Sequence, residues 1–196
     1  MKVRYVDSNR PDKAYVAHGF IIEDCDKMAE RNEAVVIEAA NLSQKDIIPE
    51  YMLRTAIFNY MIGNTDWAVP SQHNVRLLQP NGIDTGKKIP VPYDFDYSGI
   101  VGTIYAVPTE GLPIGHVKER YYMGICVPEE LLIEAIDEFE ALEEVILETI
   151  DSFPYCSKAS SKQVRSYIEK FYKMFKNKKA LIRKLESACK QNEPTI

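Results

Sequence analysis

The chain has 196 residues, 45% of them hydrophobic, and a formal net charge of -5 at pH 7. This size predicts one domain with a single core, and the negative charge excludes a general attraction to nucleic acid or to anionic membranes. No apolar run reaches the roughly 18 residues of a membrane span, and the N-terminus has no signal-peptide pattern. We therefore expect neither nucleic acid nor membrane as a partner, and leave the compartment at the cytoplasm by default.

The four cysteines stand far apart, at positions 25, 126, 156 and 189, and form no paired motif. Disulfide-stapled secreted domains use cysteine more densely, so a reduced chain is the simpler interpretation. Cys126 and Cys156 are accordingly interpreted as small buried hydrophobic residues. The three histidines have no zinc-binding spacing.

Two antiparallel strands are predicted at the N-terminus, over residues 2–7 and 14–22, because β-branched and aromatic residues flank a turn-forming segment. A short helix should begin near Lys27 with Asp24 or Asp26 as its cap, followed by a β segment at 33–39. Apolar residues at three- and four-residue spacing predict a helix that starts at Asp46 and ends at Gly63.

Beyond this helix, the pattern predicts a loop at 62–74, a hairpin of two strands around a turn at 81–87, and a long ordered loop over 98–127. An acidic helical segment over 128–152 and a basic one over 158–190 should form two or three helices of opposite charge that pack as a hairpin. The basic segment is interpreted as a solvated face that complements the acidic one. We divide the single domain into 1–40, a strand and hinge region; 41–127, a catalytic-loop core; and 128–190, a helical part.

The polar residues of the middle region follow an order that suits phosphoryl transfer. A kinase-type site needs an aspartate that accepts or orients the substrate hydroxyl, then an amide oxygen and a carboxylate that hold magnesium against the phosphates. The chain supplies Asp66, then Asn74, then Asp94 with Asp96. We expect the loop and the hairpin to bring these side chains together, with Asp94 and Asp96 on one side of an extended segment.

The segments "GNTDW", "HN" and "PYDFDYSG" resemble the catalytic core of atypical protein-kinase-like folds, particularly the CotH-like kinases and, more distantly, HipA-like and aminoglycoside phosphotransferase-like enzymes. The resemblance covers about residues 14–99. It implies an α+β fold: a mostly helical kinase-like large lobe with a short N-terminal antiparallel strand pair and a catalytic-loop hairpin.

The resemblance also implies roles for individual residues. Asp66 would be the catalytic aspartate, Asn74 and Asp94 would bind the metal, and Asp96 could share it. The segment "AYVAHGFIIEDCDKMAERN" is similar to the strand and hinge that precede the large lobe, which makes Glu23 and Asp24 the expected nucleotide-binding residues. The implied cofactors are Mg2+ and ATP, and the implied partners are the nucleotide and an unidentified phosphoacceptor.

Two departures from the family pattern keep alternatives open. The asparagine follows the aspartate by eight residues instead of five, and no glycine-rich phosphate loop or strand lysine precedes the hinge. The implied activity, transfer of a phosphoryl group from Mg-ATP to a protein or small-molecule hydroxyl, therefore belongs to an intact form, and a large lobe alone would be inactive. The alternatives are a non-catalytic kinase-fold binding or scaffold protein, able to form a homodimer through its N-terminal strands, and a metal-dependent phosphoesterase.

The residues of this region also have purely structural interpretations. Asp66 would then cap a turn after the helix end, with Trp67 packed on the core, and Asp94 and Asp96 would lie on the exposed face of a strand. His73 is interpreted as a loop-packing residue, or as one that orients the catalytic loop.

Overall fold

The computed structural model describes residues 2–38, 42–82 and 86–192. The α-helices in this part of the chain are α1 Cys25–Arg31, α2 Pro49–Ile62, α3 Glu129–Ala141, α4 Glu143–Ser152, α5 Lys158–Tyr172 and α6 Lys178–Asn192. The strands are β1 Lys2–Asp7, β2 Arg10–His18, β3 Ala34–Ile37, β4 Val75–Pro80 and β5 Ile89–Pro92, and the short 3-10 helices are η1 Gln44–Asp46 and η2 Lys173–Asn177. The fold is α+β and mostly helical, as the sequence predicts.

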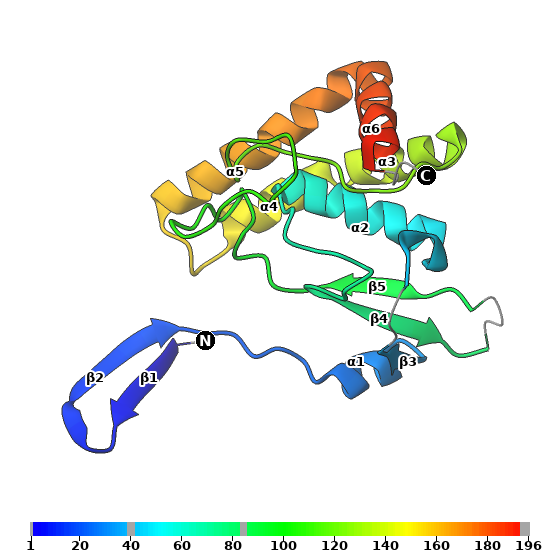
Figure 1. Ribbon diagram of the computed structural model, residues 1–196. Helices are drawn as coiled ribbons and strands as arrows, with labels where there is room; N and C mark the ends of the chain where they lie inside the picture. The colour runs from blue at the N-terminus through cyan, green and yellow to red at the C-terminus, as the bar shows by residue number, and fades with distance from the viewer. Residues whose placement is uncertain (1, 39–41, 83–85, 193–196) are drawn as a thin grey trace.

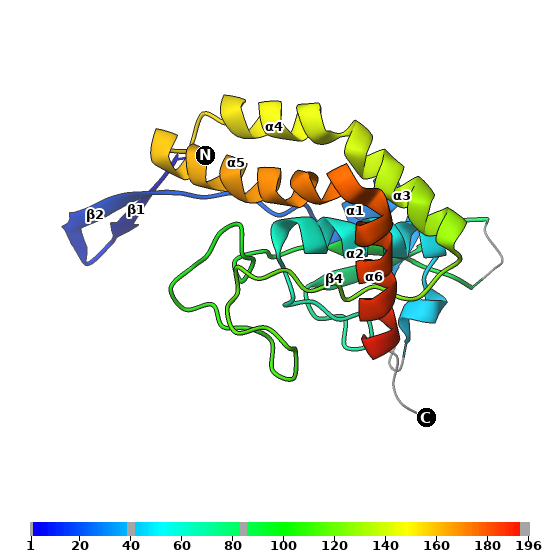
Figure 2. The same ribbon diagram turned by 90° about the horizontal axis from the view of Figure 1, so that it is seen from above.

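The elements form layers around α2. A three-stranded antiparallel sheet of order β3-β4-β5 lies on one side of α2, and α3 to α6 lie on the other (Figure 1). Seen from above, α4 and α5 run side by side and α6 crosses near the end of α5 (Figure 2). None of the described helices combines the length and the hydropathy that a membrane crossing requires.

The N-terminal strand pair is confirmed, with different limits. β1 and β2 form a separate two-stranded antiparallel sheet in which Tyr5 stacks on Tyr15, their ring centroids 4.9 Å apart. β2 ends at His18, so residues 20–22, predicted to continue the strand, are instead exposed coil. The hairpin extends away from the rest of the molecule (Figure 1).

The second sheet confirms the predicted hairpin and the predicted β segment before α2. β4 pairs with β5 in the register Val75 opposite Pro92, and β3 adds to the other side of β4 with Val36 opposite Leu78. The middle of the predicted turn, at 83–85, and the end of the predicted β segment, at 39, lie outside the described residues. The second strand was expected to run on beyond Tyr93, but β5 ends at Pro92.

Helix α2 starts later than predicted and ends where predicted. Asp46 does not begin it, because its carboxylate accepts from the Ser43 backbone N–H in the capping box of η1. Pro49 is the first helical residue, a position where its missing N–H costs nothing. Gly63, with φ 67°, closes the helix in the left-handed conformation that glycine adopts easily.

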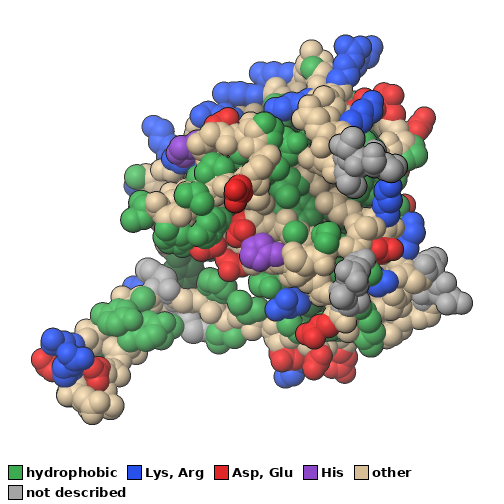
Figure 3. All heavy atoms as spheres, in the orientation of Figure 1, with side chains coloured by type: hydrophobic (Ala, Val, Ile, Leu, Met, Phe, Trp, Pro, Cys, Tyr) green, Lys and Arg blue, Asp and Glu red, His purple; other side chains and the backbone are tan. Residues whose placement is uncertain are grey.

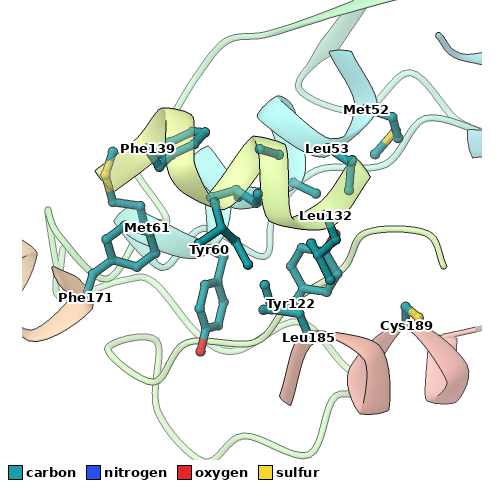
Figure 4. Close-up of a cluster of buried hydrophobic side chains, with 14 of the residues drawn as sticks. Met52, Leu53, Tyr60, Met61, Tyr122, Leu132, Phe139, Phe171, Leu185 and Cys189 are labelled. Atoms are coloured by element: carbon teal, nitrogen blue, oxygen red, sulfur yellow. The ribbon is translucent and has the colours of Figure 1, made fainter. Parts of the chain in front are cut away.

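The hydrophobic core is built around α2, which is buried on nearly all sides. Figure 4 shows Tyr60 of α2 facing side chains that come from α3, α5 and α6. The main contributors from those helices are fully or almost fully buried: Leu132, Phe139, Phe171 and Leu185. Burial of such side chains stabilises the fold by about 1.5–3 kcal/mol each, so α2 and the residues directly attached to it form a rigid base.

The C-terminal helices confirm the charge complementarity, but residues 129–192 form four α-helices, one or two more than predicted. The acidic segment breaks at Leu142 into α3 and α4. Arg165 of α5 forms an ion pair with Asp151 of α4, and Lys178 of α6 forms one with Asp137 of α3 at 2.7 Å. The oppositely charged helices therefore pack against each other as predicted.

The interpretation of two cysteines as isolated buried thiols is wrong. Cys126, just before α3, forms a disulfide with Cys189 of α6, with their Cα atoms 5.2 Å apart. Cys156 is free but exposed. Spacing along the sequence did not suggest the pairing, because the two half-cystines are brought together only by the packing of α6 against α3.

Candidate functional site

The loop between α2 and β4 is shaped so that its end returns to its beginning. Ala68 and His73 exchange two backbone hydrogen bonds of 3.0 Å, and the side chains of Trp67 and Val69 are buried in the core. This turn carries His73 and Asn74 back toward Asp66. The structural expectation for Trp67, packing on the core, is confirmed.

Asp66, His73 and Asn74 meet through direct side-chain contacts. His73 Nε2 lies 2.8 Å from Asp66 Oδ1, and Asn74 Nδ2 donates to the Asp66 backbone oxygen at 2.8 Å and to Oδ2 at 3.0 Å. With the amide nitrogen of Asn74 engaged by Asp66, the amide oxygen is the other polar atom of this side chain. That oxygen is the atom a hard cation such as magnesium would use.

A buried chain of hydrogen bonds ties Asp66 to α2. Asn59 donates to the backbone oxygen of Thr55 at 2.8 Å, Asn64 donates to Asn59 Oδ1 at 2.9 Å, and the Asp66 backbone N–H donates to Asn64 Oδ1 at 3.0 Å. Both asparagines are 1% exposed. A buried polar network of this kind fixes geometry, because each broken bond would leave an unsatisfied group.

Asp94 comes shortly after the end of β5 and lies beside the end of this loop. The Tyr93 backbone N–H donates to Asn74 O at 2.9 Å, so Asp94 is one residue beyond the residue paired with Asn74. Asp94 has φ 59°, which corrects the expectation of an extended segment with alternating carboxylates. At this position the chain leaves the sheet and turns into the long loop.

Left-handed backbone conformations concentrate here. Gln72, Asn74 and Asp94 have φ between 51° and 59°, and among the described residues only Glu33 is another non-glycine residue with positive φ. Such a conformation costs roughly 1–2 kcal/mol per residue and persists where the surroundings enforce it, often at functional sites. Of these residues, Asn74 is also one that contacts Asp66, and Asp94 lies one residue beyond the residue paired with Asn74.

Asp96 is engaged by the long loop. Its Oδ2 accepts from the Tyr105 hydroxyl at 2.9 Å, and its backbone oxygen accepts from Thr103 Oγ1 at 3.0 Å. The hydrogen bond to this carboxylate raises the pKa of Tyr105. Thr109 of the same loop donates to the Thr65 backbone oxygen at 2.9 Å. Asp96 thus helps to fasten the loop next to Asp66, and a cation would have to share it with Tyr105.

Glu23 and Asp24 have partners within their own segment. Glu23 binds Arg31 through both carboxylate oxygens, at 3.1 and 2.7 Å, and the hydrogen bond lowers the pKa of Glu23. Asp24 caps α1 by accepting from the backbone of Asp26 and Lys27. In the described residues, no contact joins either carboxylate to Asp66, so the structure does not bring these two together with the rest of the predicted site.

Sequence reasoning missed a junction that fixes the position of the long loop. Arg120 donates to Met61 O at the end of α2 and to Tyr167 O of α5, at 3.1 and 2.6 Å, and its guanidinium lies 3.9 Å from the Tyr167 ring centroid. Burial lowers the pKa of Arg120. Beside it, Gly99 N–H donates to Gly63 O at 2.9 Å, and a Cβ on Gly99 would lie 2.6 Å from a backbone oxygen.

The sequence held weak signals for these contacts. Asn59 occupies a position on the apolar stripe of α2, where an unpaired polar group would be costly, so a buried partner could have been expected. Arg120 had no such signal, because its partners are backbone oxygens of distant segments.

Two of the residues predicted to bind a metal, Asn74 and Asp94, carry oxygen donors of the kind that magnesium takes. Among the described residues, no three or more Asp, Glu, His or Cys side chains gather as a metal-binding group. Asn74 and Asp94 offer one amide oxygen and one carboxylate. Magnesium commonly takes one or two carboxylates and fills its other positions with water and substrate phosphates.

No protein-family model, curated protein or solved structure matches this chain.

Proposed function

We propose that this chain carries the magnesium-binding half of a kinase-like phosphotransferase site of the CotH-like type. In its intact form, the site would transfer a phosphoryl group from Mg-ATP to a protein or small-molecule hydroxyl. The observation that carries the proposal is the contact of Asn74 Nδ2 with the Asp66 backbone and carboxylate, with Asp94 one residue beyond the partner of Asn74.

Each residue has a distinct task in this proposal. Asp66 would orient the acceptor hydroxyl and receive its proton, while Asn74 and Asp94 would supply an amide oxygen and a carboxylate to the metal. His73 holds one oxygen of Asp66 and keeps the carboxylate in place. The buried asparagines and Arg120 act only by positioning these groups. Bound magnesium would neutralise charge on the phosphates during transfer.

The remaining predicted residues have weaker support. Asp96 could bind the metal only if its Oδ2 released the Tyr105 hydroxyl or accepted from it and bound the metal at the same time. Glu23 and Asp24 stay in the proposal as nucleotide contacts of the hinge, although Arg31 and the start of α1 already use their oxygens.

A non-catalytic binding role is the second candidate. The specific observation in its favour is the β1–β2 hairpin, which extends from the molecule and leaves Tyr15 and Val16 more than half exposed. In that role, the strained loop at Asp66 would be a retained structural feature that no longer binds nucleotide.

The disulfide favours an oxidising compartment over the cytoplasm. Disulfides rarely persist where glutathione and thioredoxin keep thiols reduced, and Cys126–Cys189 joins segments 63 residues apart. Rapid alkylation of thiols in intact cells that make the protein should find Cys126 and Cys189 protected and Cys156 labelled. Labelling of all three would place the protein in a reducing compartment.

Thermal unfolding with added ligands tests the proposed function. Mg2+ and ATP together should raise the unfolding temperature, because a ligand at about 100 times its Kd stabilises by about 2.7 kcal/mol. Asp94→Asn should abolish the shift, while Asp12→Asn, the same change on the exposed strand β2, should leave it intact.

The other outcomes separate the candidates. A shift with Mg2+ alone that ignores nucleotide would favour a metal-dependent phosphoesterase. No shift under any condition would favour the binding role, and an equal shift in Asp94→Asn would show that ATP binds somewhere else.

A further inference from the structure

The β1–β2 hairpin, residues 2–18, called the arm below, is a basic element on an acidic protein. It carries Lys2, Arg4, Arg10 and Lys13 against two aspartates, whereas the whole chain has a net charge of -5. Of these four basic residues, only Arg10 forms an ion pair in the described part of the chain, and its partner is Asp7 of the arm itself. The arm also exposes apolar side chains, Val16 being 63% exposed.

Both strands of the arm have a free edge in the described residues, but the two edges differ. β2 contains Pro11, which has no backbone N–H to donate to a neighbouring strand. β1 has no proline and places Lys2 and Arg4 on one face with Val3 and Tyr5 on the other. β1 is therefore the edge better suited to pairing with another strand.

Within the part of the chain that the structure describes, a second free edge lies on the other sheet. β3 is an outer strand in the order β3-β4-β5. The Asn81 N–H donates to Glu33 O, and Ala34 stands opposite Pro80, which cannot donate to it. Because bonding alternates along an antiparallel ladder, the backbone groups of Ala34 and Val36 point away from β4. β3 therefore offers hydrogen-bonding groups to an added strand.

The space beside this edge is acidic and has room for side chains. A cavity of about 610 Å³ lies along α1 and β3. Its charged lining residues are all acidic: Asp26, Glu30 and Glu33, called the acidic rim below. All three are exposed, and none forms an ion pair in the described part of the chain. Figure 3 shows acidic side chains gathered along this lower edge of the body, where Figure 1 places α1.

We propose that the arm of one copy pairs through the β1 edge with the β3 edge of a second copy. Lys2 and Arg4 then face the acidic rim of the cavity, and Val3, on the other face of β1, lies beside Val35, which is 49% exposed. If both copies exchange arms, the contact is reciprocal and closes a two-fold dimer. Strand addition of this kind derives its affinity from backbone hydrogen bonds and its register from side chains.

The occupant is a second copy because this chain supplies both complementary halves. The arm combines a free edge, exposed apolar side chains and unpaired positive charge, and the β3 edge combines a free edge, a cavity and unpaired negative charge. Opposite charges favour this pairing and disfavour arm-to-arm or rim-to-rim contacts. The dimer is independent of the proposed phosphotransferase activity.

Charge reversal tests the proposal on the full chain by sedimentation equilibrium. The wild type should form dimers with a dissociation constant between about 1 and 100 µM, which is weak for an interface of standard size. Lys2→Glu with Arg4→Glu, and separately Glu30→Lys with Glu33→Lys, should each raise the dimer dissociation constant by about tenfold or more. Mixing the two variants should restore dimers, because each arm then meets a rim of opposite charge.

Matched controls separate this contact from general charge and from misfolding. Lys179→Glu with Arg183→Glu changes the net charge as the arm variant does, on exposed residues of α6, and should leave the dimer intact. Circular dichroism should show that every variant is folded. A monomeric wild type, dimers that survive either reversal, or mixed variants that stay monomeric would each overturn the proposal.

Discussion

Removal of the Cys126–Cys189 disulfide should lower the free energy of unfolding by about 4 kcal/mol. The bond closes a loop of 63 residues. In the chain-entropy description, such a cross-link removes about 14 cal/mol/K from the unfolded state, or about 4 kcal/mol at 25 °C. That is a large part of the 5–15 kcal/mol that stabilises a typical domain. The disulfide joins the end of the long loop over 98–127 to α6, so removing the bond should loosen α6 first.

The assay is urea unfolding of Cys126→Ser with Cys189→Ser, compared with the wild type by circular dichroism. Cys156→Ser, at an exposed free cysteine, is the matched control and should change the unfolding free energy by less than about 0.5 kcal/mol. Thiol titration of the unfolded wild type should find two free thiols before reduction and four after it. Four thiols without reductant would show that Cys126 and Cys189 are not joined. A double variant as stable as the control would show that the bond does not stabilise the fold by this amount.

Three further predictions concern the site and the core. Asn64→Ala should lower the unfolding free energy by about 1–3 kcal/mol, because it leaves the Asp66 N–H without its acceptor, while the exposed Asn9→Ala should not; urea unfolding measures both. The free energy of unfolding of Asn74→Ala should be about 1 kcal/mol lower than that of Asn74→Gly, because both variants lose the amide but only alanine is strained at φ 53°. Equal free energies of unfolding would contradict this. Burial raises the pKa of Tyr172 to about 12, so its stabilising contribution is complete below pH 10 and is lost as the pH rises from about 10 to 12. Urea midpoints over that range should fall less steeply in Tyr172→Phe.

Local patterns predicted the elements whose structure depends on local residues. The end of α2 followed from Gly63, the cap of α1 from the choice of Asp24 or Asp26, of which Asp24 is the cap, and the β4–β5 hairpin from two apolar runs around a turn. In these cases the residue that determines the structure lies within a few positions of it. The break at Leu142 escaped prediction, because the apolar stripe of the acidic segment continues through both helices.

Features that depend on distant contacts could not be predicted in the same way. The disulfide requires α6 to pack next to the residues before α3. Asp94 has a left-handed conformation because β5 ends before it and the chain turns into a loop there. The alternation of side chains along a strand predicted instead that the extended segment continues through Asp94 and Asp96.

The candidate site was predicted in part. The order Asp66, Asn74, Asp94 led to residues that the structure does bring near one another, and the contact of Asn74 with Asp66 is direct. The asparagine network and Arg120 were missed, because their roles depend on backbone groups that no sequence motif reveals.

Manganese binding can show whether Asn74 and Asp94 form a nucleotide-dependent metal site, since Mn2+ replaces Mg2+ at oxygen-rich sites and its free form is measured by electron paramagnetic resonance. With ATP present, titration should reveal bound manganese in excess of that held by ATP alone. The excess should disappear in Asp94→Asn and persist in Asp12→Asn. No excess in the wild type, or an unchanged excess in Asp94→Asn, would contradict a nucleotide-dependent metal site at Asn74 and Asp94.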